Sequence, residues 1–319
     1  MTEFNKKVDL NEVSKFLFEN DNYIILCHAS PDGDTVGSAY ALCRALHICG
    51  KKAKVLCADE IPARYDYMTK PVEVEEFEYE KIIAVDVADT KLLGSLNEVY
   101  GDKIDLSVDH HASNKHFAKI NYVNANAAAN CENIAEVING INVKMDKVIA
   151  DNLYTGVVTD TGCFKYQNTT ATTHTVAAAL MQNGADYYNI NRLMFDTKSM
   201  ARLRVESEAI EGVEMYFDDK CALMTITAEM QKSTTPDELE GITPIPRQIE
   251  GVIVGVTMRE KAHGKYKCSV RTHEPVDASE ICALLNGGGH SRAAGCEILG
   301  TLDEAKEKML NAVKSVMYK

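Results

Sequence analysis

The sequence lacks three features that would assign it to other classes of protein. It has no basic surplus, since 34 Lys and Arg residues face 47 Asp and Glu residues and the net charge is −13. That balance argues against a protein that coats long nucleic acid. No C-x-x-C pair occurs among the ten cysteines, so a zinc knuckle or a thioredoxin motif is not expected. No uninterrupted apolar run approaches the roughly 18 residues of a membrane helix.

The cysteines and the N-terminal residues predict a cytoplasmic protein without a membrane segment. Most of the cysteines lie in apolar runs, where a free thiol behaves as a small hydrophobe, and unpaired thiols are typical of a reducing compartment. Residues 1–11 contain four charged residues and no apolar core, so this segment is not expected to be a signal peptide.

The length and the hydrophobic pattern predict two α/β domains. A chain of 319 residues corresponds to about two domains of roughly 150 residues. In the first half, short apolar runs alternate with helical stretches, which predicts a mostly parallel, doubly wound sheet with helices on both faces. Strands are expected at residues 23–27, 53–57, 81–85 and 104–108, and helices at residues 35–48, 127–138, 144–159 and 173–183.

The domain boundary is expected near residue 200, where a charged helix connects the two parts. This gives a catalytic domain over residues 1–200 and a smaller α/β domain over residues 201–319. The predicted elements from the boundary onward are helices at residues 198–216, 278–285 and 302–317, strands at residues 221–228, 251–259 and 266–272, and a loop at residues 287–289.

Side chains that can bind metal ions follow three of the predicted strands. His28 comes directly after the first strand, Asp86 after the third, and an Asp-His-His run at residues 109–111 after the fourth. Ligands bind to parallel sheets beyond the carboxyl ends of the strands. That edge of the sheet is therefore expected to gather imidazole and carboxylate groups.

Two further segments add carboxylates to this set. The loop after His28 contains Asp32 and Asp34, and a Gly-flanked turn at residues 156–162 contains Asp160. Each has an ordinary interpretation when taken alone, because an Asp in a loop often caps the next helix. Together these groups exceed what one divalent ion needs, and they fit two. The candidate metal ligands are His28, Asp32, Asp34, Asp86, His110 and Asp160.

The mixture of imidazole and carboxylate suits Mn²⁺, so we expect two divalent metal ions, with Mn²⁺ as the metal. Two ions about 3.5–4 Å apart can share a bridging carboxylate and a bridging hydroxide that attacks phosphorus. The set of residues therefore predicts metal-dependent hydrolysis of a phosphate ester.

A glycine-rich stretch in the second domain predicts an anion site. Residues 286–295 read Asn-Gly-Gly-Gly-His-Ser-Arg-Ala-Ala-Gly, and consecutive glycines expose backbone N–H groups that bind anions. Arg271 lies on a predicted strand shortly before this stretch, and arginine suits bidentate contact with phosphate. The alternative interpretations are a flexible turn and a surface arginine.

In this order, the motifs resemble the DHH phosphoesterase superfamily. The resemblance rests on H-x-x-P-D-x-D-x-x-G-S at residues 28–38, on Asp86, on the Asp-His-His run at residues 109–111 and on Asp160. Four later stretches resemble the DHH-associated C-terminal domain, at residues 258–260, 269–271, 276–277 and 287–295. The compact size is similar to the subgroup of nanoRNase (oligoribonuclease)/pAp phosphatases and stand-alone phosphodiesterases of linear dinucleotides.

The resemblance implies a role for each candidate residue. One Mn²⁺ would be held by His28, Asp32 and Asp86, and the other by Asp34, Asp86, His110 and Asp160, with Asp86 bridging. His111 would lie near the scissile phosphate as a transition-state stabiliser or proton donor, and Asp109 would orient the histidines. The terminal phosphate or the base of the substrate would be bound in a cleft between the domains by Arg271, Gly287, Gly288, Gly289 and His290.

Two positions depart from the usual pattern of the family. Asn286 stands where the family usually has a fourth glycine, and residues 127–132 (Ala-Ala-Ala-Asn-Cys-Glu) replace a version that contains Ser or Thr. Because all metal positions are intact, these departures bear on substrate preference and not on hydrolysis.

The resemblance implies hydrolysis of short RNA oligonucleotides to mononucleotides and of 3′-phosphoadenosine 5′-phosphate to AMP. Long duplex nucleic acid and membranes are not expected as partners, and a homodimer is compatible with the sequence. One alternative is a phosphodiesterase of linear dinucleotides, such as pApA or pGpG, in cyclic-dinucleotide turnover. A non-enzymatic alternative is a nucleotide-binding regulator, whose mark would be a missing metal ligand.

Overall fold

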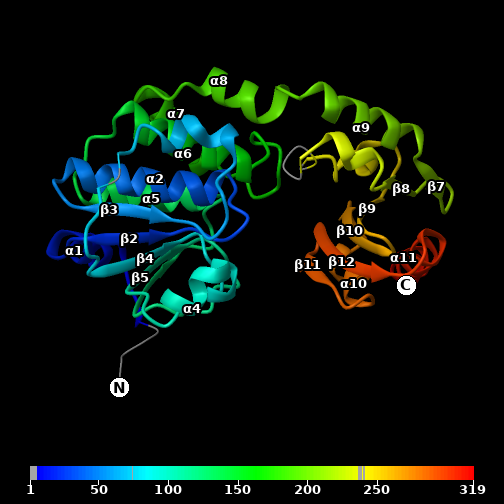
Figure 1. Ribbon diagram of the computed structural model, residues 1–319, viewed down its shortest axis with the longest axis horizontal. Helices are drawn as coiled ribbons and strands as arrows, with labels where there is room; N and C mark the ends of the chain where they lie inside the picture. Colours follow the sequence, from blue (N-terminus) through cyan, green and yellow to red (C-terminus); the bar gives the residue numbers. More distant parts are fainter. Residues whose placement is uncertain (1–5, 74, 236–238, 240) are drawn as a thin grey trace. The chain divides into compact units, whose positions relative to one another are not determined.

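The chain forms two compact units in the computed structural model, which describes residues 6–73, 75–235, 239 and 241–319. The first unit runs from Met1 to Thr197 and the second from Lys198 to Lys319 (Figure 1). Residues 1–5 of the charged N-terminal segment lie outside the described residues. Each unit has its own sheet and its own hydrophobic core.

The first unit contains a six-stranded parallel sheet, which confirms the predicted architecture. Its strands are β1 (Lys6–Lys7), β2 (Tyr23–Leu26), β3 (Ala53–Leu56), β4 (Lys81–Val85), β5 (Leu106–Asp109) and β6 (Ile120–Val123). They lie in the order β1-β6-β5-β4-β2-β3, and every pairing is parallel. β1 and β6 are not predicted from the sequence, because β1 is two exposed lysines and β6 carries a single buried residue.

Long helices cover one face of this sheet and short helices the other (Figure 1). The long helices are α2 (Gly33–Ile48), α5 (Asn130–Gly140) and α6 (Lys147–Asp160), and the short ones are η2 (Thr90–Leu96) and α4 (Asn97–Tyr100). Ile25 and Ile83 pack in the core under the long helices, whereas their neighbours Ile24 and Ile82 pack in the core on the other face. This alternation follows from the two-residue period of a strand. The remaining helices of the unit are α1 (Leu10–Glu19), η1 (Ala63–Tyr65), α3 (Asp66–Thr69), α7 (Ala171–Gln182), α8 (Tyr187–Asn191) and the π-helical turn η3 (Arg192–Asp196).

Capping side chains decide where the long helices begin. The Asp32 carboxylate accepts hydrogen bonds from the backbone N of Asp34 and Thr35, so α2 begins at Gly33, before the predicted residue 35. Asp146 caps α6 in the same way, so that helix begins at Lys147 and not at residue 144. α5 begins at Asn130, because residue 129 is still extended.

The predicted Gly-flanked turn at residues 156–162 is wrong in its first half, because α6 continues through Gly156 to Asp160. Glycine is needed inside this helix, since a Cβ at Gly156 would lie 2.2 Å from Cys131 Sγ and 2.7 Å from Asp34 Oδ1. A Cβ at Gly37 would lie 2.4 Å from the carbonyl oxygen of Asn152, so α2 and α6 also meet through a glycine.

The strand order places a ligand site at one edge of the sheet. β2 lies between β3 and β4, so the chain builds outward in opposite directions from β2 and β4. In parallel sheets, ligands bind beyond the carboxyl ends of the strands at such a switch point. His28 follows β2 and Asp86 follows β4, which puts both residues at this point.

The second unit is built on a mixed sheet. Its elements are α9 (Met200–Glu211), β7 (Glu214–Tyr216), β8 (Cys221–Ile226), η4 (Met230–Ser233), η6 (Ile245–Gln248), β9 (Val254–Ala262), β10 (Lys265–Thr272), α10 (Ala278–Ala283), β11 (Gly288–His290), β12 (Ala293–Leu299) and α11 (Leu302–Met317). The strands lie in the order β11-β12-β10-β9-β8-β7. The β8–β9 pairing is parallel, and all other pairings are antiparallel.

Two predictions for this unit are wrong. The charged helix expected over residues 198–216 ends at Glu211, and Glu214–Tyr216 forms the edge strand β7. The loop expected at residues 287–289 is replaced by the edge strand β11, which pairs with β12. Glycines weaken strand propensity, so the local sequence gives no signal for β11, and pairing with β12 decides its structure.

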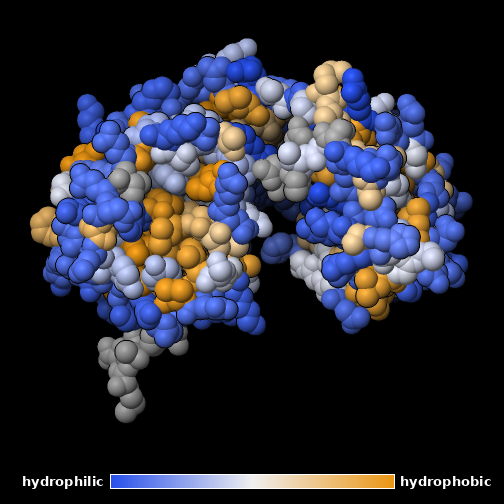
Figure 2. Space-filling model, in the orientation of Figure 1, coloured by the Kyte–Doolittle hydropathy of each residue, from blue (hydrophilic) through white to orange (hydrophobic). Residues whose placement is uncertain are grey.

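Hydrophilic residues cover most of the surface visible in Figure 2, with smaller apolar areas between them. Among the described residues, no helix combines the length and apolar character that a membrane crossing requires.

Candidate metal centre

His28, Asp32 and Asp86 form the first cluster of potential ligands, with ligand atoms that all lie within 4.8 Å of one another. His28 Nε2 lies 3.6 Å from Asp32 Oδ2 and 3.6 Å from Asp86 Oδ2. Asp32 uses Oδ1 to cap α2, which leaves Oδ2 facing His28. The helix-cap interpretation of Asp32 is therefore correct, and it leaves one oxygen available to a cation.

Asp34, His110 and Asp160 form the second cluster within the same limit. His110 Nε2 lies 3.8 Å from Asp34 Oδ2 and 3.5 Å from Asp160 Oδ2. Asp34 comes from the first turn of α2, His110 directly follows β5, and Asp160 is the last residue of α6. Three elements far apart in the sequence thus converge on one point.

Asp86 joins the two clusters. Its Oδ2 faces His28, and its Oδ1 lies 3.5 Å from His110 Nε2 and 3.6 Å from His111 Nδ1. Asp86 is buried, and Oδ1 has no hydrogen-bond partner in the part of the chain that the structure describes. A buried carboxylate oxygen without a partner is costly. A divalent cation would satisfy it, so these residues fit a metal centre.

Backbone carbonyls orient both cluster imidazoles. His28 Nδ1 lies 2.8 Å from the carbonyl oxygen of Ala29, and His110 Nδ1 lies 3.2 Å from that of Ala127. A carbonyl can only accept, so Nδ1 carries the hydrogen in each ring. Nε2 is then the nitrogen that faces the carboxylates and that a metal ion would take as its ligand, the arrangement found in metal-binding histidines.

Asp109 lies behind the clusters and holds the two histidines. Its Oδ1 accepts hydrogen bonds from the backbone N of His110 (2.8 Å) and His111 (3.3 Å) and from His111 Nδ1 (2.8 Å). Its Oδ2 accepts from Asn114 Nδ2 at 2.6 Å. Asp109 is fully buried, and with both oxygens occupied it orients its neighbours.

The buried carboxylates repel one another in the absence of a cation. Burial and the negative charge of Asp86 raise the pKa of Asp34 to about 7. Burial and the charges of Asp34 and Asp86 raise the pKa of Asp160 well above its usual value. Burial lowers the pKa of His28, but hydrogen bonds with Asp32 and Asp86 outweigh it and raise that pKa to about 11. The clusters therefore carry an excess of negative charge that protons or metal ions compensate.

The metal-free protein is expected to become less stable as the pH rises from about 5 to about 8. The folded state holds the protons of Asp34 and His28 more tightly than the unfolded chain. The stability that the Asp34 proton contributes is complete below pH 3.8 and is lost up to about pH 7. The His28 contribution is complete below pH 6.5 and is lost as the pH rises towards about 11. Thermal melts in chelator across this range measure the effect, and Asp34→Asn should flatten the part below about pH 7. A melting temperature that rises with pH would contradict this account.

Backbone N–H groups at the start of α5 bind Asp34, a residue of the second cluster. The backbone N of Asn130 donates to Asp34 Oδ2 at 2.6 Å, and that of Cys131 donates to Asp34 Oδ1 at 2.9 Å. The N-terminus of a helix favours a carboxylate through these unpaired N–H groups. The segment that departs from the usual family pattern at residues 127–132 thus contacts candidate metal ligands of this chain.

The backbone contacts of residues 127–131 with the second cluster are not predicted from the sequence. Asn168 is also not predicted, although its Nδ2 donates to the carbonyl oxygens of Ala128 and Asp160. Residues 127–132 stood out only as a departure from a familiar pattern. The available signal was a helix N-terminus predicted close to several carboxylates, which is weak without the fold.

Arg271 and His290 lie on one face of the second sheet. Arg271 on β10 pairs with Ala293 on β12, and Ala293 pairs in turn with His290 on β11. Directly paired residues point to the same side of a sheet, and two strand spacings separate Arg271 from His290 by about 10 Å. Ala293, which has a small side chain, lies between them in this row.

The glycines next to His290 allow β11 to lie close to β12. A Cβ at Gly287 would lie 2.3 Å from the carbonyl oxygen of Gly295, and one at Gly289 would lie 2.6 Å from that of Ala293. Asn286 has a positive φ of 57°, a conformation that asparagine tolerates better than most residues. Asn286 can therefore replace a glycine without a change of backbone. As an edge strand, β11 keeps N–H groups that the ladder does not use.

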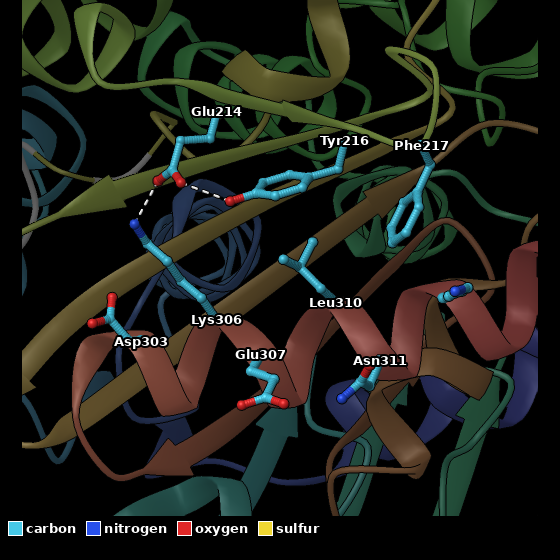
Figure 3. A pocket seen from close by; sticks show the side chains of 9 residues that line it. Glu214, Tyr216, Phe217, Asp303, Lys306, Glu307, Leu310 and Asn311 are labelled. Carbon is cyan, nitrogen blue, oxygen red and sulfur yellow. Dashed lines mark hydrogen bonds and ion pairs between the residues drawn. The ribbon is translucent and has the colours of Figure 1, made fainter.

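A pocket of 460 Å³ lies at the other edge of the second sheet, between β7 and α11 (Figure 3). Glu214 accepts hydrogen bonds from Lys306 and from the Tyr216 hydroxyl, so these groups satisfy one another. β7 and β11 are opposite edges of the sheet. The pocket is thus separate from the row of Arg271 and His290.

Comparisons with known proteins agree with this geometry. Residues 22–157 match the DHH family, N-terminal domain, and residues 220–319 match the DHHA1 domain. The bifunctional oligoribonuclease and PAP phosphatase NrnA of Thermus thermophilus is 30% identical over 302 residues, which are 91% of this chain and 88% of that protein. The probable bifunctional oligoribonuclease and PAP phosphatase NrnA of Streptococcus mutans is 26% identical, covering 86% of this chain and 89% of that protein.

The fold has a solved counterpart. The crystal structure of an exopolyphosphatase-related protein from Bacteroides fragilis superimposes with a TM-score of 0.87 at 25% identity, covering 96% of this chain and 95% of that one. Both family matches and the identity to the Thermus thermophilus protein support one assignment. The chain belongs to the DHH family of phosphoesterases, with a DHHA1 domain in its C-terminal unit.

Proposed function

We propose that this phosphoesterase uses Mn²⁺ to hydrolyse short RNA oligonucleotides to mononucleotides and 3′-phosphoadenosine 5′-phosphate to AMP. One observation carries the proposal: two clusters of candidate ligands adjoin through Asp86, whose buried Oδ1 has no hydrogen-bond partner among the described residues. The substrate class is supported by the relatives named oligoribonuclease and PAP phosphatase.

The first cluster (His28, Asp32 and Asp86) would hold one ion. The second cluster (Asp34, His110 and Asp160) would hold the other and share Asp86 with the first. DHH phosphoesterases depend on metal ions, and the mixed imidazole and carboxylate donors favour Mn²⁺. When bound, two divalent ions lower the pKa of a water molecule and neutralise charge on the phosphoryl oxygens. The protein contributes fixed Nε2 and carboxylate positions, which the Ala29 and Ala127 carbonyls and the α5 amides hold in place.

His111 is the proposed proton donor to the leaving oxygen, and Asp109 is its positioning residue. The hydrogen bond with Asp109 raises the pKa of His111 to about 9, although burial opposes it. His111 uses Nδ1 in that bond, so its Nε2 remains available to a substrate oxygen.

The C-terminal domain, residues 201–319 of the predicted division, is the proposed substrate-binding part. Arg271, His290 and the N–H groups of Gly287, Gly288 and Gly289 would bind the terminal phosphate or base. Arginine and backbone N–H groups both suit phosphate oxygens. The proposal includes a preference for short chains over long nucleic acid, which the charge of −13 supports.

All ten cysteines are free. Free thiols are typical of proteins in a reducing compartment, which supports a cytoplasmic location.

Product analysis with Mn²⁺ tests the proposed function. The experiment compares 3′-phosphoadenosine 5′-phosphate, a linear dinucleotide, a 5-mer RNA and a 24-mer RNA in parallel, with EDTA as the control. Fast release of mononucleotides from the short RNAs and of AMP from the bisphosphate, with slow cleavage of the 24-mer, is the expected result. Turnover confined to the dinucleotide would replace the proposal with a role in signalling-nucleotide degradation. Turnover that EDTA does not stop would contradict the metal assignment.

Arg271→Ala is expected to raise KM for the bisphosphate by about tenfold or more, because hydrogen bonds to charged groups contribute roughly 1.5–3 kcal/mol. Mn²⁺ affinity should not change, because Arg271 lies in the C-terminal unit and the clusters in the first. Steady-state kinetics and an Mn²⁺ titration measure the two quantities. Lys267→Ala is the matched control, since it removes a cation from the same strand and the same face. An unchanged KM for every phosphorylated substrate would remove Arg271 from the proposal.

A further inference from the structure

The segment that leads into α5 binds two residues of the second cluster directly and is linked to the third through Asn168. Within residues 127–131, backbone groups bind Asp34 and His110 directly. Asn168 links the same segment to the carbonyl oxygen of Asp160. The position of α5 relative to β5 and α2 therefore sets the geometry of this cluster.

A chain of buried amide and hydroxyl groups connects β5 to α2 through α5. Asn133 Nδ2 donates to the carbonyl oxygen of Asp109 at 3.1 Å and to Asn130 Oδ1 at 3.3 Å. Asn130 Nδ2 donates in turn to Ser38 Oγ at 3.1 Å. All four residues are fully buried. This series of hydrogen bonds starts at Asp109, one residue before His110, and ends at Ser38 on α2, the helix that carries Asp34.

Asn133 is an unfavourable choice for packing alone. Burial of an amide costs free energy unless hydrogen bonds replace its water, and Asn133 Oδ1 has no partner among the described residues. An apolar residue would normally occupy such a fully buried helix position. Asn133 Nδ2 makes two hydrogen bonds although its Oδ1 makes none among the described residues, which points to a positional role for the donor side.

We propose that Asn133 is a positioning residue of the second cluster, which holds the end of β5 with His110 against the α5 amides that bind Asp34. The Asp109 carbonyl also accepts from the backbone N of Asn124, so Asn133 adds a second, side-chain restraint to that strand end. The inference rests on the proposed two-metal function. It predicts that loss of the Asn133 amide weakens the second metal site and spares the first. The hydrogen bonds of Asn133 and Asn130 lead to the second cluster and not to His28 or Asp32.

Asn133→Leu and Asn133→Ala test this role. Leucine keeps the branched shape without the donor, and alanine removes the donor without added volume. Asn152→Leu is the matched control. Asn152 is also a fully buried helix asparagine, its Nδ2 donates to two carbonyl oxygens, and its Oδ1 has no partner. Its bonds go to Met68 and Val148 and not to the cluster.

The readouts are an Mn²⁺ titration followed by electron paramagnetic resonance and a thermal melt in chelator. The wild type is expected to bind two ions that give an exchange-coupled spectrum. Both Asn133 variants should bind the first ion as the wild type does and the second about tenfold or more weakly, within the range for groups that orient metal ligands. Their spectra should show the pattern of single, uncoupled ions. Asn152→Leu should lower the melting temperature and keep the coupled pair.

Four outcomes would overturn the inference. A coupled pair of normal affinity in both Asn133 variants, with normal hydrolysis, removes Asn133 from the site and leaves the proposed function intact. Loss of the pair in Asn152→Leu, or loss of folding in both Asn133 variants, assigns Asn133 to general stability. A wild type that binds fewer than two ions overturns the proposed function together with this inference.

Discussion

Asp86→Asn is expected to abolish hydrolysis while the metal-free protein stays folded. Asp86 is the carboxylate shared by the two clusters, with one oxygen 3.6 Å from His28 Nε2 and the other 3.5 Å from His110 Nε2. An amide offers one weaker oxygen and no charge, so both proposed ions would lose a ligand. The loss should exceed the roughly 10–100-fold typical of groups that only orient metal ligands.

The same change should keep or raise the melting temperature in chelator. It removes a negative charge beside Asp34 and Asp160, whose pKa values that charge raises. Asp86 has a positive φ of 58°, which asparagine tolerates and alanine tolerates less well. Asparagine is therefore the sharper replacement. Asp89→Asn in the same loop is the control, since Asp89 only caps η2. Near-normal turnover of Asp86→Asn with Mn²⁺ would contradict the shared-ligand assignment.

Asp109→Asn should reduce kcat by about 10–100-fold, the range for groups that orient metal ligands, and move the alkaline limb of the pH profile to lower pH. The Asp109 carboxylate accepts three N–H groups at Oδ1 and one at Oδ2. An asparagine has one acceptor oxygen, so one of these donors must face an NH₂ group. The loss of negative charge also lowers the pKa of His111, which the hydrogen bond with Asp109 raises to about 9. Less of the proposed proton donor is then protonated above neutral pH.

Asp105→Asn separates this effect from general destabilisation. Asp105 is also buried, at the start of the same strand region, and accepts from the backbone N of Ile82 and from Lys119. Its replacement should lower the melting temperature without a shift of the pH profile. If Asp109→Asn lowers kcat equally at every pH, the proposed link between Asp109 and the His111 proton is wrong.

The sequence pattern predicts the fold where local signals are strong. β4 and α11 match their predicted bounds, since an apolar run ends at Asp86 and an amphipathic stretch follows Thr301, which caps α11. The predicted loop at residues 287–289 and the predicted helix end at residue 216 are wrong. A glycine-rich edge strand (β11) and a three-residue strand (β7) carry no local signal in the sequence. Their structure depends on pairing with β12 and β8.

The order of apolar runs and polar residues along the chain is enough to predict which side chains collect at the ends of the strands, because polar side chains after apolar runs in a parallel sheet must meet at one edge. It does not predict the distances between these side chains. It also does not predict that one oxygen of Asp32 caps a helix while the other faces His28. The groups that hold the candidate ligands in place are visible only in the folded chain. The α5 amides lie 96 and 97 positions from Asp34 in the sequence, and Asn133 lies 24 positions from Asp109. Such contacts are set by helix packing on the sheet, so no local pattern encodes them.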